Sequence, residues 1–394
     1  MNAQTFYAMC AVDRSPVEET GFNPYFRQVD SFRRGRPEID GNTFIDWASN
    51  DYLSLASEER IKRAMIEAVE LYGSSLCATP AASGYARSLA LLERDLARFV
   101  LLDDALVFPS CYQANTALFT ALAGRDDCIL VDRCAHASLI QGIRAVGCKI
   151  KPFLHNSPSY LEKLLKNSPG YRQVFVVTES VFSTEGSIAP VKEIVNLCKR
   201  YNAIPVIDDS HGIGVVGKGG RGILQYGDLR LFDGIYVASL GKALANSGGM
   251  IAASRACIEA LRYRCAGLLY STAITPVTVA GIHAAMGIID SEFGKRGGTM
   301  WSNTQRLAET VRIAGEDPGP CESAIVSIRC GPAPRAIRLA RRLFDRGILG
   351  TPFIPPSVPP GGSVVRLIPG AKTAEHDIDR VCGLVHEALK EQAL

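Results

Sequence analysis

The sequence predicts an α/β protein with a mostly parallel sheet that is covered on both faces. Short apolar runs rich in Val and Ile alternate with amphipathic stretches through the middle of the chain, which is the pattern of βαβ units. These runs carry few polar residues, as strands buried on both faces require. Strands are predicted at 105–108, 128–131, 174–177, 204–208, 234–239 and 249–253.

The domain organisation follows from length and from a change in texture along the chain. The 394 residues are enough for one large and one smaller domain. After about residue 290, beginning at FGKRGGTM (293–300), we expect helix, strand, basic helix, proline-rich loop, strand and final helix, which form a smaller α+β domain. The predicted units are an N-terminal arm leading into the large domain (1–55), the large domain (56–290) and the small C-terminal domain (291–394).

The composition is that of an ordinary soluble globular protein, with 47% hydrophobic residues, 21% charged residues and a net charge of +3. This balance does not predict a nucleic-acid partner, and no apolar run is long enough to span a membrane. The twelve cysteines include no C-x-x-C pair, and with six scattered histidines they predict reduced thiols in a cytoplasmic protein without a metal site. The N-terminus lacks the basic and apolar regions of a signal peptide.

Two segments have the pattern of a phosphate site. RAIRLARRLFDR (335–346) is predicted as a helix with Ile337, Ala340 and Phe344 on one face. Its arginines are expected to be a solvated face, the alternative being that they hold the phosphates of a ligand. GIGVVG (212–217) matches the dinucleotide fingerprint, but KGGRG follows it and would break the helix that the fingerprint has to open, so no dinucleotide site is predicted.

Candidate functional residues gather at the carboxyl ends of the predicted strands, where open α/β sheets bind ligands. Any one of them is explained by a helix cap, a turn or a core histidine. Five such ends converging in one sheet favour a ligand site instead. These residues are Ser110, which is followed by a predicted helix opening near residue 114, His136, Glu179, Ser183, Asp208, Asp209, His211, Ser239 and Lys242.

Lys242 lies in ASLGKALANSGG (238–249), a stretch made almost entirely of small residues. Small neighbours allow a flat ligand to approach, and loss of hydration favours the neutral amine, which can form a Schiff base. An acid at a strand end can pair with a pyridine nitrogen, and a helix N-terminus with a hydroxyl group can hold a phosphate monoester. Together these parts predict a site for pyridoxal 5'-phosphate (PLP).

The chain resembles the α-oxoamine synthases of PLP fold type I. This group includes amino-oxononanoate synthase of the biotin pathway, aminobutyrate-CoA ligase, aminolevulinate synthase, bacterial serine palmitoyltransferase and the autoinducer synthase. The resemblance covers nearly the whole chain, and its most specific motifs are DDSH (208–211) and SLGK (239–242). Other matching segments are NPYF (23–26), SNDYLSLA (49–56), LLERDLARF (91–99), TESVFSTEGSIAP (178–190) and VVRL (364–367).

The resemblance implies a PLP transferase fold of type I, with PLP as cofactor, and assigns catalytic roles by position. Lys242 is expected to bind PLP covalently and to act as acid and base at the substrate Cα. Asp208 is expected at the pyridine nitrogen and His136 on the face of the ring. His211 and Ser183 are expected to contact the phenolic oxygen.

The remaining expected contacts also come from the resemblance. The backbone at Cys111 and Tyr112, with Ser239, is expected to hold the phosphate. A homodimer with a shared active site is implied, because Ser271 and Thr272 resemble a segment that the second subunit contributes. The other expected site residues are Glu179, in the cofactor site, and Asn50 and Arg366, which match substrate contacts, Arg366 through the substrate carboxylate.

The implied reaction is a decarboxylative Claisen condensation. A carbanion formed from a small amino acid attacks an acyl thioester of CoA or of a carrier protein, and an α-amino ketone, carbon dioxide and a free thiol are released. One alternative is the amino-oxononanoate synthase of biotin biosynthesis. Another is a fold type I aminotransferase, which usually carries an arginine soon after the lysine, where this chain has ALANSGG. A non-catalytic PLP-fold binding protein is expected to have lost Lys242 or Asp208.

The chain departs from the biotin enzyme at two places. Segment 75–89 lacks most of the expected glycines, with Leu89 in place of a histidine, and Thr373 replaces another histidine seven residues after Arg366. If the family geometry holds, this segment lies near the amino-acid side chain or the acyl thioester. These departures predict that donors other than glycine and alanine are accepted.

Overall fold

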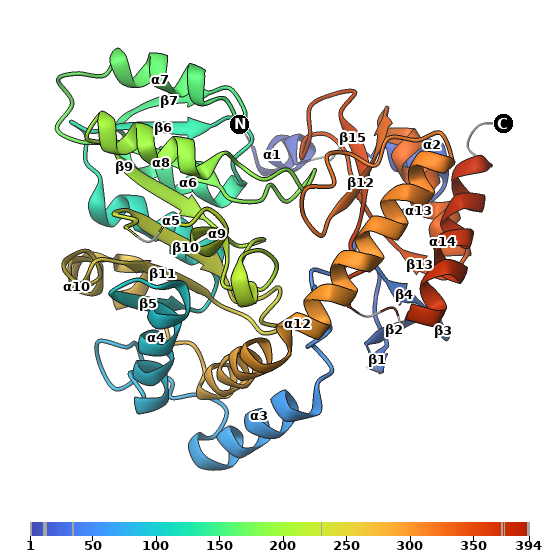
Figure 1. The fold of residues 1–394 in the computed structure, drawn as a ribbon, viewed down its shortest axis with the longest axis horizontal. Coiled ribbons are helices and arrows are strands. Elements are labelled where there is room, and N and C mark those ends of the chain that lie inside the picture. Colours follow the sequence, from blue (N-terminus) through green and yellow to red (C-terminus); the bar gives the residue numbers. More distant parts are fainter. Residues whose placement is uncertain are drawn as a thin grey trace.

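The computed structural model describes residues 2–10, 14–33, 35–229, 231–371, 373 and 375–391. Its centre is a seven-stranded sheet of order β5-β11-β10-β9-β8-β6-β7 (Figure 1). The strands run parallel except β11, which is antiparallel to both β10 and β5, so the predicted mostly parallel sheet is confirmed. The strands are β5 (Asp104–Phe108), β6 (Cys128–Asp132), β7 (Lys149–Phe153), β8 (Val174–Glu179), β9 (Ile204–Asp208), β10 (Ile235–Ser239) and β11 (Gly249–Ala253).

Both faces of this sheet are buried. Along β11, Met250 and Ala252 pack into one hydrophobic core, whereas Ile251 and Ala253 pack into the core on the opposite face. Because the side chains on both faces of the strand are apolar, its sequence is a continuous hydrophobic run. The helices of this part are α3 (Glu59–Tyr72), α4 (Arg87–Val100), α5 (Cys111–Leu122), α6 (Ala137–Val146), α7 (Pro158–Lys166), α8 (Val191–Arg200), α9 (Ile223–Tyr226), α10 (Arg255–Arg264) and α11 (Ala266–Leu269), with a 3-10 turn η1 (Lys218–Gly220).

One edge strand, β7, was not predicted from the sequence. Its segment KIKPF carries two lysines and a proline, and the residues before Phe153 are exposed or only half-buried. Proline and lysine are typical of an edge strand, which has to avoid pairing with other chains. The segment therefore lacks the apolar run by which the buried strands were found.

A smaller layered unit contains a three-stranded sheet of order β12-β15-β14. Its core joins this sheet to α13, α14 and the end of α12. Ile337 and Ala340 of the basic helix α13 are buried as predicted, while Arg338 and Arg341 form ion pairs near the surface. The elements are α12 (Pro276–Ile313), β12 (Val326–Gly331), α13 (Ala333–Asp345), β13 (Ile348–Leu349), β14 (Thr351–Phe353), β15 (Ser363–Leu367) and α14 (Glu375–Lys390).

The helix predicted after the domain boundary is longer in the structure and begins before that boundary. The expected start near residue 301 lies inside a single helix of 38 residues that begins at Pro276. Each glycine in a helix costs about 1 kcal/mol relative to alanine, yet Gly297 and Gly298 do not end it. Buried residues continue on both sides of the pair, from Ile289 to Met300, so packing outweighs the local propensity. The division near residue 290 stays a prediction, and α12 runs through it.

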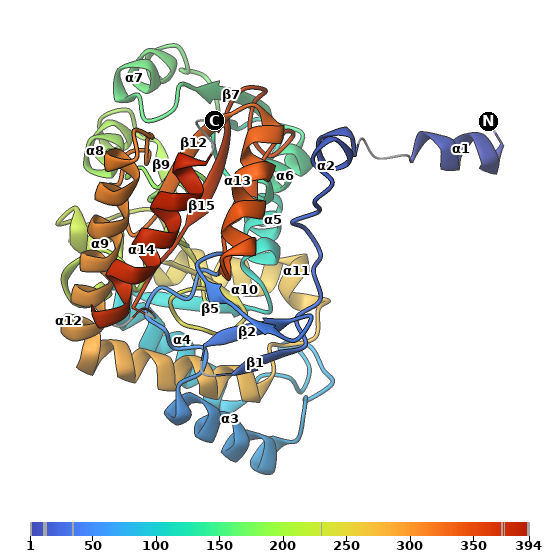
Figure 2. The same cartoon turned by 90° about the vertical axis from the view of Figure 1, so that its right-hand side faces the viewer.

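Much of the N-terminal segment packs on the smaller unit, whereas its end at Tyr52, Leu53 and Leu55 is buried in the main core just before α3. Strand β4 pairs in parallel with β13, and Trp47 is buried in the core of the smaller unit. Helix α1 has no buried residue and stands away from the rest of the molecule (Figure 2). The elements are α1 (Ala3–Met9), α2 (Ser15–Thr20), β1 (Ser31–Arg33), β2 (Arg36–Ile39), β3 (Asn42–Thr43) and β4 (Ile45–Asp46).

Cysteines and helix hydropathy add two general findings. All twelve cysteines are free thiols, and five of them are buried. Over the residues that the structure describes, each helix is too short or too polar to cross a membrane.

Candidate active site

A cavity of about 360 Å³ lies where the carboxyl ends of β8, β9 and β10 meet the first turns of α5 and α6. The predicted convergence of strand ends is therefore observed. Nine of the predicted site residues line the cavity: Ser110, Cys111, Tyr112, His136, Glu179, Asp208, His211, Ser239 and Lys242. The lining also includes Pro109, Asn115, Ser138, Ser210, Gly241, Asn246, Ser247 and Gly248.

Lys242 follows β10 directly and lies in the wall of the cavity. Burial lowers the pKa of its ammonium group, and the nearby carboxylates of Asp208 and Glu179 oppose that shift. Small neighbours are needed because backbones approach closely here. A Cβ on Gly214 would lie 2.4 Å from the Cβ of Ala243. This partial desolvation of the half-buried lysine shifts it toward the neutral amine, the reactive form.

Asp208 ends β9, and its carboxylate is oriented from two sides. It accepts hydrogen bonds from Asn115 Nδ2 at 2.7 Å and from the backbone N–H of Ser210 at 3.0 Å. Glu179 is its direct neighbour in the sheet register. Burial and the charge of Asp208 raise the pKa of Glu179 to about 8. Glu179 is therefore largely protonated at neutral pH.

The two histidines of the cavity are held by hydroxyl groups. Nδ1 of His211 lies 2.7 Å from the hydroxyl of Tyr52, and Nδ1 of His136 lies 2.7 Å from Oγ of Ser138. Burial lowers the pKa of both histidines, and the charge of Lys242 lowers it further. Both imidazoles are therefore neutral and fixed in orientation.

The first turn of α5 offers an anion site. Ser110 caps the helix by accepting the N–H of Gln113 at 3.1 Å, and the helix begins at Cys111 rather than near the predicted residue 114. The N–H groups of the first helical turn have no partner within the helix and bind phosphate well. A Cβ on Gly249 would lie 2.3 Å from Cα of Cys111, so glycine is required for β11 to approach this turn.

Arg366 and Asn50 lie outside the lining of this cavity but carry unpaired buried atoms. Nη1 of Arg366 donates to the carbonyl of Ser183 at 2.8 Å, and its guanidinium lies over the ring of Phe353. Nε of Arg366 and Oδ1 of Asn50 are buried and have no hydrogen-bond partner in the structure. A buried unpaired group costs about 1–3 kcal/mol, so these atoms suit a polar ligand.

Ser183 lines a second and larger cavity of about 870 Å³. The two cavities are lined by consecutive residues of the turn after β6. Ala135 lines the larger cavity and His136 lines the smaller one. Phe182 contributes an apolar wall. The proline-rich segment 355–360 forms the opposite side.

The remaining predicted residues lie elsewhere. Ser271 is half-buried and Thr272 is exposed, and neither lines the cofactor-sized cavity. The two departing positions are structural: Leu89 is buried in the main core, and Oγ1 of Thr373 accepts a hydrogen bond from Trp47 at 3.1 Å. Leu89 and Thr373 therefore do not form the wall of either cavity described above.

Four residues of the site were not found from the sequence: Tyr52, Asn115, Ser138 and Ser210. Asn115 lies four residues after Cys111, on the same face of α5, so a helical wheel of α5 could have placed it at the cavity. Tyr52 lies far away in sequence, and only the fold brings it to His211. No local pattern distinguishes it.

The glycine-rich segment after DDSH surrounds a buried carboxylate rather than a nucleotide. Asp209 accepts hydrogen bonds from Tyr236 at 2.7 Å and from the N–H of Ile223 at 2.9 Å, and burial raises its pKa to about 7. A Cβ on Gly212 or Gly222 would lie about 2 Å from its carboxylate oxygens. The rejected dinucleotide pattern is explained by this packing.

Comparisons with known proteins agree with the geometry. The profile of the aminotransferase class I and II family matches residues 42–385. An 8-amino-7-oxononanoate synthase of Geobacter sulfurreducens is 34% identical over 95% of this chain and 96% of its own. The same-named protein of Symbiobacterium thermophilum is 33% identical over 96% of both chains. A serine palmitoyltransferase structure from Sphingomonas wittichii matches 100% of this chain and 99% of its own, with a TM-score of 0.95 and 25% identity.

The fold and the site define a PLP-dependent transferase of fold type I. The chain belongs to the aminotransferase class I and II family, and its relatives place it in the α-oxoamine synthase group. PLP fits the residues present. The cavity offers an oriented carboxylate at Asp208, an amine with a lowered pKa at Lys242 and free N–H groups at the start of α5.

Replacing Asp208 with asparagine tests the electrostatic part of this site. The Asp208→Asn variant keeps the size of the side chain and removes the charge, so we expect turnover to fall by about 10²-fold or more. Initial rates and the visible absorbance of bound PLP are measured together. Asp95→Asn, a change at the surface near His283, is the control and should keep its rate. Near-normal turnover of Asp208→Asn with PLP bound would show that this carboxylate has no such role.

Proposed function

We propose that this enzyme condenses a small amino acid with an acyl thioester and releases carbon dioxide, a free thiol and an α-amino ketone. The proposal rests on the combination of groups in this site. The pKa of Lys242 is lowered by burial, and the carboxylate of Asp208 is held by Asn115. Arg366 has a buried Nε without a hydrogen-bond partner and is bonded to Ser183, which lines the larger cavity. When bound, PLP supplies the electron sink for the carbanion at Cα.

The roles proposed for the side chains follow from their surroundings. Lys242 takes the Cα proton, because burial favours its neutral amine. When PLP is bound, Asp208 would stabilise its protonated ring nitrogen, and His136 would contact its ring. Arg366 holds the substrate carboxylate through its otherwise unpaired Nε–H, and the unpaired Oδ1 of Asn50 accepts a hydrogen bond from a donor group of the substrate.

The larger cavity is the proposed place of the acyl thioester. Phe182, Val358, Val364 and the prolines of segment 355–360 give it an apolar lining that suits an acyl chain. Ala135 lines this cavity and the next residue, His136, lines the cofactor-sized cavity, which supports placing the two substrates in neighbouring parts of the site. Both CoA and carrier-protein esters present the same chemistry to it.

A matrix of amino acids against acyl-CoAs, scored by CoA release and product mass, tests this function. The donors are glycine, alanine, serine and 2-aminobutyrate, each measured as kcat/KM with medium- and long-chain acyl groups. Pocket changes of a methylene or two discriminate by only about 1–3 kcal/mol, so we expect at least one donor other than glycine or alanine to be used.

Each result of the matrix points to one member of the group. Strict use of alanine with a pimeloyl thioester would restore 8-amino-7-oxononanoate synthase, the name carried by the sequence relatives. Amino-group exchange with a keto acid and no thiol release would point to an aminotransferase. No turnover of any pair would contradict the proposed condensation.

The proposed active unit is a cytoplasmic homodimer whose two sites lie at the interface. Thr272 is exposed and lies outside the cavity of its own chain, although it resembles a phosphate contact. Segment 75–86 is tied to this region, because the N–H of Ala273 donates to the carbonyl of Ala78 at 3.0 Å. The free thiols of the chain support the cytoplasmic location.

Mixing two inactive variants tests the shared site. Lys242→Ala removes the amine and Thr272→Asp places a negative charge where the partner's phosphate is proposed to bind. In a hybrid dimer one of the two sites combines an intact Lys242 with an intact Thr272, so the mixture should recover up to about a quarter of wild-type activity by random pairing. No recovery after confirmed exchange of subunits, or a fully active monomer by light scattering, would exclude this arrangement.

A further inference from the structure

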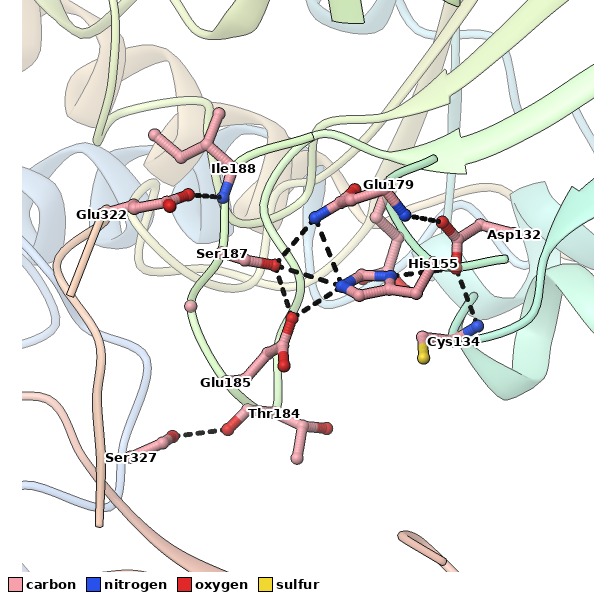
Figure 3. Close-up of polar contacts among 12 residues, drawn as sticks. Asp132, Cys134, His155, Glu179, Thr184, Glu185, Ser187, Ile188, Glu322 and Ser327 are labelled. Carbon is pink, nitrogen blue, oxygen red and sulfur yellow. Dashed lines mark hydrogen bonds and ion pairs between the residues drawn. The ribbon is translucent and has the colours of Figure 1, made fainter. Parts of the chain in front are cut away.

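A buried polar cluster outside the cofactor cavity joins two loops of the active site. His155 follows β7, and its ring lies between Asp132 and Glu185 (Figure 3). Nδ1 lies 3.0 Å from Oδ1 of Asp132, and Nε2 lies 2.7 Å from Oε1 of Glu185. The edge of the ring packs on Phe182, with 4.3 Å between ring centroids.

The histidine is held as a cation. Burial lowers the pKa of His155, but hydrogen bonds to Asp132, Cys134 and Glu185 raise it more, to about 11. His155 also lowers the pKa of Glu185. Both ring nitrogens therefore donate to carboxylates, and such charge-assisted hydrogen bonds are about twice as strong as neutral ones.

One end of the cluster is fixed to the turn that carries His136. Besides His155, Asp132 Oδ1 accepts the N–H of Cys134 at 2.8 Å, and Oδ2 accepts the N–H of Asn156 at 3.0 Å. Asp132 ends β6 and its side chain is fully buried. The turn 132–136 and the end of β7 are thus tied to one carboxylate.

The other end is fixed to the turn 183–188, which connects β8 with α8 and touches the smaller unit. Oγ of Ser327 donates to the carbonyl of Thr184 at 2.5 Å, and the N–H of Ile188 donates to Glu322 at 2.8 Å (Figure 3). The carbonyl of Ser183 in the same turn accepts Arg366. Whatever fixes this turn therefore fixes the anchor of Arg366.

We propose that His155 is a positioning residue for the reaction, which holds the turns of His136 and Ser183 at a set distance across the larger cavity. The inference rests on the proposed role of Arg366 toward the substrate carboxylate. Of the clamp of Asp132, His155 and Glu185, Glu185 lines that cavity, and Cys134 of the turn held by Asp132 lines it too. Displacing a positioning group by about 1 Å can cost about 10²-fold in rate.

The variants His155→Gln and Glu185→Gln test the clamp, with His283→Gln as the matched control. His283 forms a similar pair with Asp95, at 3.1 Å, between α12 and α4. We expect both clamp variants to raise KM for the amino acid about tenfold, with a smaller change in kcat and unchanged PLP absorbance. The KM of the double variant should be no higher than that of the more impaired single variant, because each single substitution already breaks the same clamp. The control should keep its kinetic constants.

Hydrogen exchange tests the clamp without turnover. In the PLP-loaded enzyme without substrate, the peptide covering 183–188 should exchange about tenfold faster in both clamp variants, while peptides of α12 stay unchanged. This readout judges the clamp even if the proposed condensation is wrong. Kinetics and exchange equal to those of the control would overturn the proposal.

A metal site is the competing explanation of the same residues. Single ligand atoms of Asp132, Cys134 and His155 lie within 4.8 Å of one another. Titration with Co²⁺ detects such a site by a thiolate absorption band. We expect no band and no effect of chelators. A stoichiometric band that is lost in Cys134→Ser would replace the clamp by a metal centre.

Discussion

The desolvation of one amine, that of Lys242, is the constraint on which the rest of the site depends. An ammonium group keeps its proton strongly in water, so a lysine that has to act as a base needs a dry place. The protein provides one by closing a cavity with backbone and small side chains. Asp208, Cys111 and Glu179 oppose the resulting decrease in the pKa of Lys242, and Glu179 is largely protonated at neutral pH because its pKa is raised to about 8.

Close backbone approaches build this dry cavity, and they explain the glycines around it. Gly249 lets β11 touch the first turn of α5, and Gly214 lets the loop after DDSH touch Ala243. Gly212 and Gly222 make room for the carboxylate of Asp209, which in turn fixes that loop. The glycines of the segment that matches the dinucleotide fingerprint are thus explained by close packing around the buried carboxylate of Asp209.

Much of this arrangement was predictable because it is local or periodic. The buried strands are short apolar runs, and polar residues directly after them have to meet at one edge of a parallel sheet. Lys242, Asp208 and His136 were found in this way, and the structure brings them to one cavity.

What was missed depends on contacts between distant segments. Tyr52 reaches His211 from an N-terminal segment that packs largely on the smaller unit, and no spacing rule connects the two. Helix α12 passes through Gly297 and Gly298 because its buried faces outweigh the local cost of glycine. Leu89, at a position expected near the substrate, packs into the core because α4 turns that face inward.

Chemical trapping of the cofactor tests the central claim most directly. The purified enzyme is loaded with PLP, reduced with borohydride and digested, and the peptides are analysed by mass spectrometry. The account predicts a pyridoxyl group on Lys242, with loss of absorbance between about 330 and 420 nm in Lys242→Ala, because PLP is the chromophore that this lysine holds. A pyridoxyl group found only on another lysine, with unchanged absorbance in Lys242→Ala, would contradict it.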